Sequence, residues 1–175
     1  MSAEFSREYI DYTVFLGMNA AEPSVRLACK ALLVARLEGR LFMTWDHVGR
    51  CDDVVWSHAR ALQDRYYPFM DALHSCPFLT REGYEDSTLR LAGSDHRLAS
   101  LPVLQRLLVA RAIEREAVIY TADPTLADRQ DLPVRAPPRC EQEPAFPPLL
   151  EALYRDALAL RLATLEGGVN PCTVA

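Results

Sequence analysis

Two aspartates follow short apolar segments that lie far apart in the chain. Asp11 comes directly after Tyr9-Ile10, and Asp123 follows Val118-Ile119-Tyr120 by three positions. If the two segments form neighbouring strands of a parallel sheet, both acids emerge at its carboxyl edge, where open α/β folds bind their ligands. Carboxylate oxygens are the ligands that hard divalent cations prefer. The two aspartates are therefore the first candidates for a metal site.

Each aspartate also has a purely structural interpretation. Asp11 could be only a polar strand end or a cap, but a carboxylate within the apolar run from Ile10 to Leu16 is costly unless it is satisfied, which argues for a site. Asp123 precedes Pro124, and Thr-X-Asp-Pro is typical of a turn that begins a helix. We favour a site at Asp11, because acids with perturbed pKa values gather at functional edges. Asp123 alone is equally well explained as a cap.

The apolar pattern of the first half predicts alternating strands and helices. The expected elements are a strand at 9–12, a helix from 23 that stops at 39, a strand at 41–44, a helix from about 46 to 64–66, and a helical piece at 68–74. Pro23 suits the first turn of a helix and Gly39 its end. Asp46 is expected to cap the helix that follows the second strand. Pro68 predicts a break or kink.

Residues 75–100 are the least regular part, and the pattern then returns. The expected elements are a short helix at 85–91, a helix from 101 to 113, a strand at 117–121, an edge strand at 132–135 and a helix from 146 to about 163. Proline is tolerated at a sheet edge, which is why the strand containing Pro133 is placed there. The predicted fold class is α/β, with a small central parallel sheet between two helical layers.

The C-terminal part is expected to be distinct from this domain. Residues 1–140 form the α/β domain, residues 141–164 an amphipathic helix after a proline-rich linker, and residues 165–175 a disordered tail. The apolar stripe of the helix predicts packing on the domain. Docking on a second subunit, which would make a homodimer, is the alternative.

Composition limits the functional classes. The chain has 175 residues, half of them apolar, which suits one globular domain. Its formal charge of −5 gives no general attraction for nucleic acid, so RNA binding would need a local basic groove. Five scattered cysteines without a C-x-x-C pair predict a reduced, cytoplasmic protein, and no stretch is long and apolar enough for a membrane. His47 and Cys51 lack the second pair of ligands that a zinc site needs.

The run I-D-Y-T-V-F-L at 10–16 and the stretch L-L-V-A-R-A-I-E-R-E-A-V-I-Y-T-A-D at 107–123 resemble the PIN domain family. The resemblance covers roughly residues 8–135. It implies an α/β/α fold and, as in many members, a Mg²⁺- or Mn²⁺-dependent ribonuclease that is often the toxin of a toxin–antitoxin pair. It places Asp11 and Thr13 at the first acid and its nearby hydroxyl, and Asp123 and Thr121 at the late acid and its hydroxyl. The cations would activate a water and stabilise the charge that builds on the phosphorus centre.

Two further acidic positions of the family differ in this chain. The expected glutamate after the second strand falls near Arg50, and the remaining aspartate aligns with Gln105. The nearest substitutes are Asp46 and Asp53, which share a helix stripe with Arg50, and Asp95, upstream of Gln105. An arginine four and three residues from two aspartates is more typical of an ion-pair ladder on a solvated helix face.

Two hypotheses follow. In the first, the chain is a PIN-like metal-dependent ribonuclease with the metal ligands Asp11, Asp123, Asp53, Asp46 and Asp95, and with Thr13 or Thr121 positioning the water. In the second, it is a catalytically inactive PIN-like protein that binds RNA, a small ligand or a protein partner such as an antitoxin in the same cleft. The first requires the two strand-end acids to be neighbours. The second follows from Arg50 and Gln105 at two acidic positions.

Overall fold

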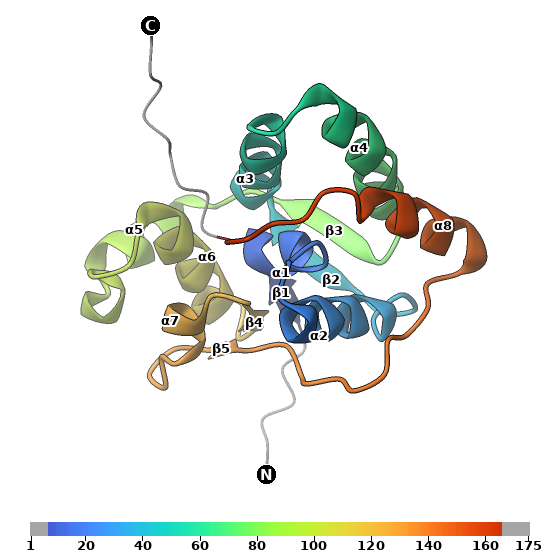
Figure 1. Cartoon of the computed structure of the whole chain (residues 1–175). Helices are drawn as coiled ribbons and strands as arrows, with labels where there is room; N and C mark the ends of the chain where they lie inside the picture. Colours follow the sequence, from blue (N-terminus) through green and yellow to red (C-terminus); the bar gives the residue numbers. More distant parts are fainter. Residues whose placement is uncertain (1–6, 166–175) are drawn as a thin grey trace, which may run out of the picture.

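A five-stranded parallel sheet runs through the protein, whose computed structural model describes residues 7–165 (Figure 1). Its strands are β1 (Glu8–Ile10), β2 (Leu41–Thr44), β3 (Leu79–Glu82), β4 (Val118–Tyr120) and β5 (Val134–Arg135). The order across the sheet is β3-β2-β1-β4-β5. The central strand β1 therefore pairs with β2 on one side and with β4 on the other.

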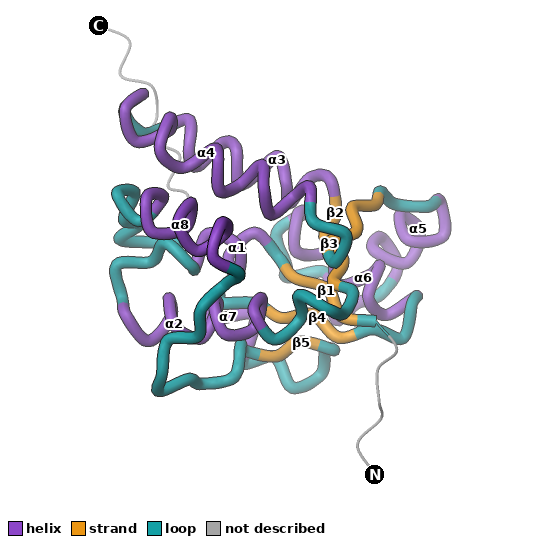
Figure 2. The backbone as a smooth tube through the Cα atoms, turned by 90° about the vertical axis from the view of Figure 1, so that its right-hand side faces the viewer, coloured by secondary structure: helices purple, strands orange, loops and turns teal. Residues whose placement is uncertain are grey.

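Helices cover both faces of the sheet. They are α1 (Tyr12–Gly17), α2 (Pro23–Val34), α3 (Trp45–Trp56), α4 (Arg60–Ser75), α5 (Asp86–Ser94), α6 (Val103–Glu114), α7 (Pro124–Ala127) and α8 (Pro148–Ala157), with a 3-10 turn at His96–Leu98. Figure 2 shows α1, α2, α3, α4 and α8 on one side of the strands and α5 and α6 on the other. Side chains alternate along the strands. Ile10 and Met43 consequently belong to the hydrophobic core between the sheet and helices α1, α2, α3, α4 and α8. Tyr9 and Phe42 belong to a second core, between the sheet and helices α5 and α6. The predicted three-layer α/β/α fold is confirmed.

Most predicted elements occur close to their expected positions. The strands at 41–44 and 117–121 correspond to β2 and β4, and the edge strand at 132–135 corresponds to β5 at one end of the sheet. The helices expected from 23 and 101 correspond to α2 and α6. These segments combine strong periodicity with clear start and stop residues, which makes them readable from sequence.

Two local predictions were wrong, and one strand was not predicted. The strand expected at 9–12 ends at Ile10, because the Asp11 side chain caps α1 instead of continuing the strand. The helical structure is interrupted at residues 57–59, between α3 and α4, whereas Pro68 lies at an exposed position inside α4. The irregular region holds an unpredicted edge strand, β3, in which only Leu79 is buried.

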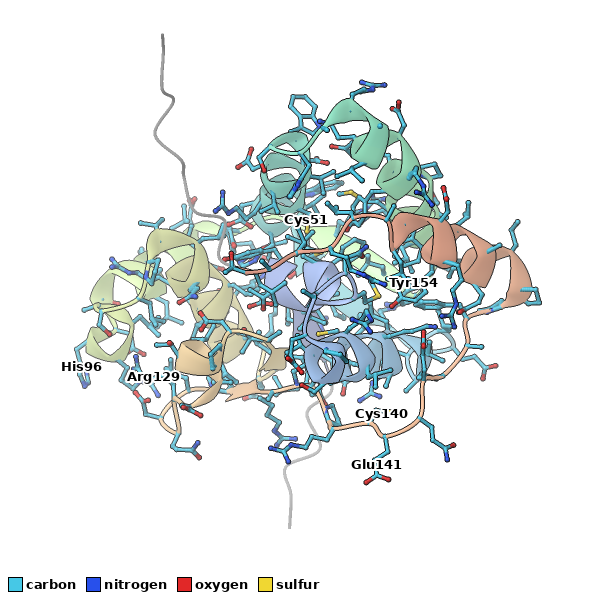
Figure 3. The ribbon with its side chains drawn as sticks, in the orientation of Figure 1. Cys51, His96, Arg129, Cys140, Glu141 and Tyr154 are labelled. Atoms are coloured by element: carbon cyan, nitrogen blue, oxygen red, sulfur yellow. The ribbon has the colours of Figure 1, made fainter. Side chains whose placement is uncertain are left out.

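The C-terminal helix α8 packs on α2 and α4 of the same chain. Tyr154 points from α8 into the protein (Figure 3), where its ring lies 5.3 Å from that of Phe69 on α4. Lys30 on α2 is fully buried and forms ion pairs of 2.8 and 3.0 Å with Glu143 and Glu151. These contacts hold the segment after the sheet against α2 and α4. Most of the expected tail, residues 166–175, lies outside the described residues. Within residues 7–165, no helix is long and apolar enough to cross a membrane.

Candidate functional site

The strand order defines one place where a ligand is expected. From β1 the chain moves to β2 and β3 on one side of the sheet, and it returns to β4 and β5 on the other. At such a switch point the connections after the two central strands leave in opposite directions, which opens a crevice at their carboxyl ends. Here the crevice lies between the residues after β1, beginning with Asp11, and those after β4, which lead to Asp123. The prediction that these two strands are neighbours is confirmed.

Asp11, the residue directly after β1, is buried, with 1 % of its surface exposed. Its Oδ1 accepts hydrogen bonds from the backbone N–H groups of Thr13 and Val14, at 3.0 and 3.1 Å, which makes it the N-cap of α1. The Thr13 hydroxyl donates to the same oxygen at 2.5 Å, and the Thr121 hydroxyl donates to Oδ2 at 2.6 Å. Burial raises the pKa of Asp11, although nearby His47 and these donors oppose the shift. Four donors within the protein thus satisfy this carboxylate.

The two threonines join the acids of β1 and β4. Thr121 Oγ1 donates to Asp11 and accepts the backbone N–H of Asp123 at 3.1 Å. Thr13 Oγ1 accepts the backbone N–H of Ala122 at 2.8 Å and lies 3.3 Å from Thr121 Oγ1. The hydroxyls predicted to accompany the acids are therefore at the same edge. Their role in this structure is to fix the turn after β4 against the start of α1.

Asp123 is the N-cap of α7 and is partly exposed. Its Oδ1 accepts from the backbone N–H groups of Thr125 and Leu126, at 2.8 and 3.4 Å. Its Oδ2 accepts from the side-chain amide of Gln105 on α6, at 2.7 Å. The residue at one of the expected acidic positions thus places a hydrogen-bond donor directly on the other candidate acid. Both structural interpretations of the aspartates, as helix caps, describe their local geometry.

The three remaining candidate acids have other partners. Asp46 accepts from the hydroxyls of Thr44 and Tyr84, at 2.5 and 2.9 Å. Asp53 is exposed on α3 and lies 3.7 Å from Arg50, as in an ion-pair ladder. Asp95 caps the 3-10 turn and pairs with Arg97. In the described range 7–165, no three carboxylate, imidazole or thiol side chains come together as a cation-binding cluster.

His47 is a further residue of this edge whose position the sequence did not reveal. It is buried on α3, and its Nδ1 accepts the backbone N–H of Tyr12 at 3.2 Å. Burial lowers the pKa of His47, although the charges of Asp11 and Asp46 oppose the shift. Because Nδ1 accepts a hydrogen bond, Nε2 carries a proton, which faces the carbonyl oxygen of Leu104 at 3.4 Å. His47 therefore fixes the backbone just after Asp11. Only its place three residues after a buried strand could have hinted at this role.

A cavity of about 510 Å³ opens at the switch point. Tyr12, Ser100, Leu101, Pro102, Gln105, Asp123, Thr125, Leu126 and Arg129 line it. Its walls are mainly apolar, whereas Asp123 and Gln105 supply polar groups. Arg129, beside α7 in Figure 3, is the other charged lining residue, and its guanidinium is bound to Asp131 at 2.8 Å. The carboxylate of Asp123 is thus the charge that the cavity offers to a ligand.

This arrangement does not fit the Mg²⁺ or Mn²⁺ site that the resemblance implied. Divalent cations need several oxygen ligands that are free to turn toward them. Asp11 directs its oxygens to donors inside the protein, and the Gln105 amide directs an N–H at Asp123. The edge instead offers hydrogen bonds and apolar contact.

Fold and site together define a three-layer α/β protein with a ligand-sized cavity at the switch point of its sheet. The chain belongs to the family described as "Family of unknown function (DUF6190)", whose profile matches residues 1–166. No curated protein matches the chain.

Proposed function

We propose that this chain is a PIN-like binding module without metal-dependent nuclease activity, and that it binds its ligand in the switch-point cavity. The observation that carries the proposal is the 2.7 Å hydrogen bond from the Gln105 amide to Asp123. A divalent cation needs several anionic oxygen ligands, and Gln105 places an amide donor where the resemblance implied a further acid. The neutral side chain of Gln105 also adds no negative charge that would balance the charge of the cation.

The burial of Asp11 supports the same conclusion. A carboxylate that activates a metal-bound water must contact the metal, whereas this one is enclosed and accepts four hydrogen bonds that stabilise α1 and the turn after β4. Replacing these bonds by a metal ion would leave donors unsatisfied in a buried place, at a cost of about 1–3 kcal/mol each.

The cavity lining indicates the chemistry of the ligand. Tyr12, Leu101 and Leu126 favour an apolar or aromatic body. Asp123 favours a positively charged or donor-rich end, because it is an acceptor and the neighbouring Arg129 is already bound to Asp131. A phosphate group would face the carboxylate of Asp123 unfavourably. We therefore propose a small ligand, or a side chain of a protein partner, with a cationic end on an apolar body.

Benzamidine is a suitable probe of this proposal, because it joins an amidinium to an aromatic ring. We expect heat of binding in titration calorimetry that is lost in the Asp123→Asn variant. Asparagine keeps the cap of α7 but removes the charge. Benzamide, the neutral analogue, is the control and should bind much more weakly. Equal binding of both compounds, or binding that survives in Asp123→Asn, would contradict the proposal.

A second experiment tests the loss of the metal site. In the Gln105→Glu variant two carboxylates would face each other at the position of the present hydrogen bond, and like charges this close favour an ion between them. We expect Mn²⁺ to bind this variant roughly tenfold or more tightly than the parent, because affinity follows the number of charged ligands. Gln130→Glu, which adds the same charge at an exposed position, is the matched control.

The alternative function is a metal-dependent ribonuclease. It is favoured by the position of Asp11 and Asp123 at the same edge, joined through Thr121. Mn²⁺ binding to the parent, together with RNA cleavage that disappears in Asp11→Asn, would establish it in place of the binding module. A thermal melt of the variant is needed beside this assay, because Asp11 also caps α1.

A further inference from the structure

The side-chain amide of Gln105 brings a hydrogen-bond acceptor to the wall of the switch-point cavity. Its nitrogen is the end that faces Asp123, because a carboxylate can only accept hydrogen bonds. The oxygen Oε1 of the same amide accepts no hydrogen bond from residues 7–165 and is not enclosed by them. Since Gln105 lines the cavity, this oxygen is an open acceptor for a ligand.

The Asp123 carboxylate has one oxygen with spare capacity. Oδ1 accepts the backbone N–H groups of Thr125 and Leu126, which use the two lone pairs of that oxygen. Oδ2 accepts one hydrogen bond within the described part of the chain, from Gln105, so its second lone pair is open. Asp123 Oδ2 and Gln105 Oε1 are therefore two open acceptors, held side by side by the 2.7 Å hydrogen bond between the two residues.

The charged donor of the cavity lining is already engaged. The Arg129 guanidinium donates to both carboxylate oxygens of Asp131, to the carbonyl oxygen of Arg97 and to the Ser100 hydroxyl. A ligand must therefore supply its own N–H groups to the two open acceptors. The negative charge of Asp123 favours a ligand in which these N–H groups carry a positive charge.

We propose that the cavity selects a planar cation, a guanidinium or amidinium group, over an ammonium group, and that Gln105 determines this preference. The inference rests on the proposed function and names the chemical class of its ligand. A planar cation carries its N–H groups along its edge, so that two of them can donate at once to Asp123 Oδ2 and Gln105 Oε1. The side chain of arginine is the natural source of such a group.

The apolar walls favour a planar cation for a second reason. Its two faces carry no N–H group and can lie against Leu101, Pro102 and Leu126. An ammonium group directs three N–H groups around its axis and is more strongly hydrated than a guanidinium. At least one of its N–H groups would face an apolar wall without a partner, which is unfavourable.

Benzamidine and benzylamine carry the two kinds of cation on the same aromatic ring, and both are singly charged at neutral pH. Titration calorimetry gives their Kd values for the parent and for Gln105→Leu. In the parent, benzamidine should bind roughly tenfold more tightly, the factor that one hydrogen bond to a charged group contributes. In Gln105→Leu, which removes Oε1 but keeps Asp123, the ratio should fall close to one. Gln130→Leu, the same change at an exposed position, is the matched control and should keep the ratio of the parent.

The outcomes separate this inference from the proposed function. Equal binding of the two compounds by the parent, or a preference for benzamidine that survives in Gln105→Leu, would overturn the inference and leave a cation-binding cavity. Binding of neither compound would overturn both. The comparison in the parent needs no substitution, and a thermal melt shows whether Gln105→Leu is folded.

Two further titrations distinguish the sources of a guanidinium group. Tighter binding of N-acetyl-arginine amide than of free L-arginine would indicate an arginine side chain of a protein partner, and the reverse order would indicate the free amino acid. Both should bind more tightly than the corresponding lysine compounds. A preference for the lysine compounds would contradict the proposal.

Discussion

His74 is a buried histidine whose ring nitrogens have no hydrogen-bond partner in the part of the chain that the structure describes. Its ring stacks on Phe15 of α1, with 4.7 Å between the centroids. Burial, with the positive charge of Arg81 nearby, lowers the pKa of His74 to about 4. The side chain therefore acts as a neutral aromatic ring at physiological pH, and a proton on it would be costly.

This depressed pKa predicts how stability depends on pH. In the unfolded chain, His74 takes up a proton as the pH falls below its ordinary pKa of about 6.5. In the folded protein it takes up this proton only near pH 4. Folding free energy contributed by neutral His74 is thus complete above pH 6.5 and is lost as pH falls toward 4. The loss is about 3 kcal/mol at most. In His74→Phe, urea unfolding at a series of pH values should show a smaller fall over this interval.

The pH comparison has a clear contradictory outcome. If His74→Phe and the parent lose stability in parallel between pH 6.5 and 4, the pKa of His74 is not lowered by folding. Above pH 7 the two proteins should differ little, because phenylalanine preserves the stacking on Phe15.

Single residues also mark the limit of prediction from sequence. Asp11 and Asp123 could be found, because an acid after an apolar strand is unusual. Their partners could not, because Thr121 reaches Asp11 across 110 positions and Gln105 reaches Asp123 from another helix. The decisive facts about the site are these long-range donors. Sequence spacing carries no information about them.

At the scale of elements, α1 and α2 meet at a point with no spare room. Gly17, the last residue of α1, approaches Cys29 of α2 so closely that an added Cβ would lie 2.5 Å from its Sγ. Cys29 is fully buried, and its Cβ would also lie only 3.3 Å from the added atom. The approach seats the short helix α1 against α2 beside the switch point.

We expect Gly17→Ala to lower the free energy of unfolding by about 1–3 kcal/mol, the usual cost of overpacking. Denaturant unfolding followed by circular dichroism would measure it. Cys29→Ala removes the sulfur, so the double variant should be more stable than the sum of the single changes predicts, by about 1 kcal/mol or more. Strict additivity would show that the two residues do not clash.

Element boundaries were less predictable than element types. Pro68 indicated a break or kink, yet α4 continues through this exposed position, and the interruption of the helical structure precedes Arg60. The strand β3 escaped prediction because Thr80, Arg81 and Glu82 are not an apolar run, and its position at the sheet edge makes such a run unnecessary. Exposure, which the linear pattern does not reveal, decided both cases.

At the scale of the whole molecule, the layer architecture was predictable because strands and helices alternate along the chain. The polar contacts that hold the C-terminal segment were not. They centre on Lys30, the one lysine of the chain, which is buried between Glu143 and Glu151 and whose ammonium lies 4.4 Å from the centre of the Tyr154 ring. A single cation thus joins α2, the segment after β5 and α8.

The pairing of β1 with β4 has a consequence for the order in which the protein folds. During synthesis, Asp11 leaves the ribosome more than a hundred residues before Thr121, which donates to its Oδ2. Contacts between such distant residues close a long loop and form late. Until then β1 lacks one of its two neighbours and the carboxylate of Asp11 remains incompletely satisfied. The nascent chain can therefore gather β1, β2 and β3 early, whereas the edge that carries the candidate site is completed only after residue 121 has emerged.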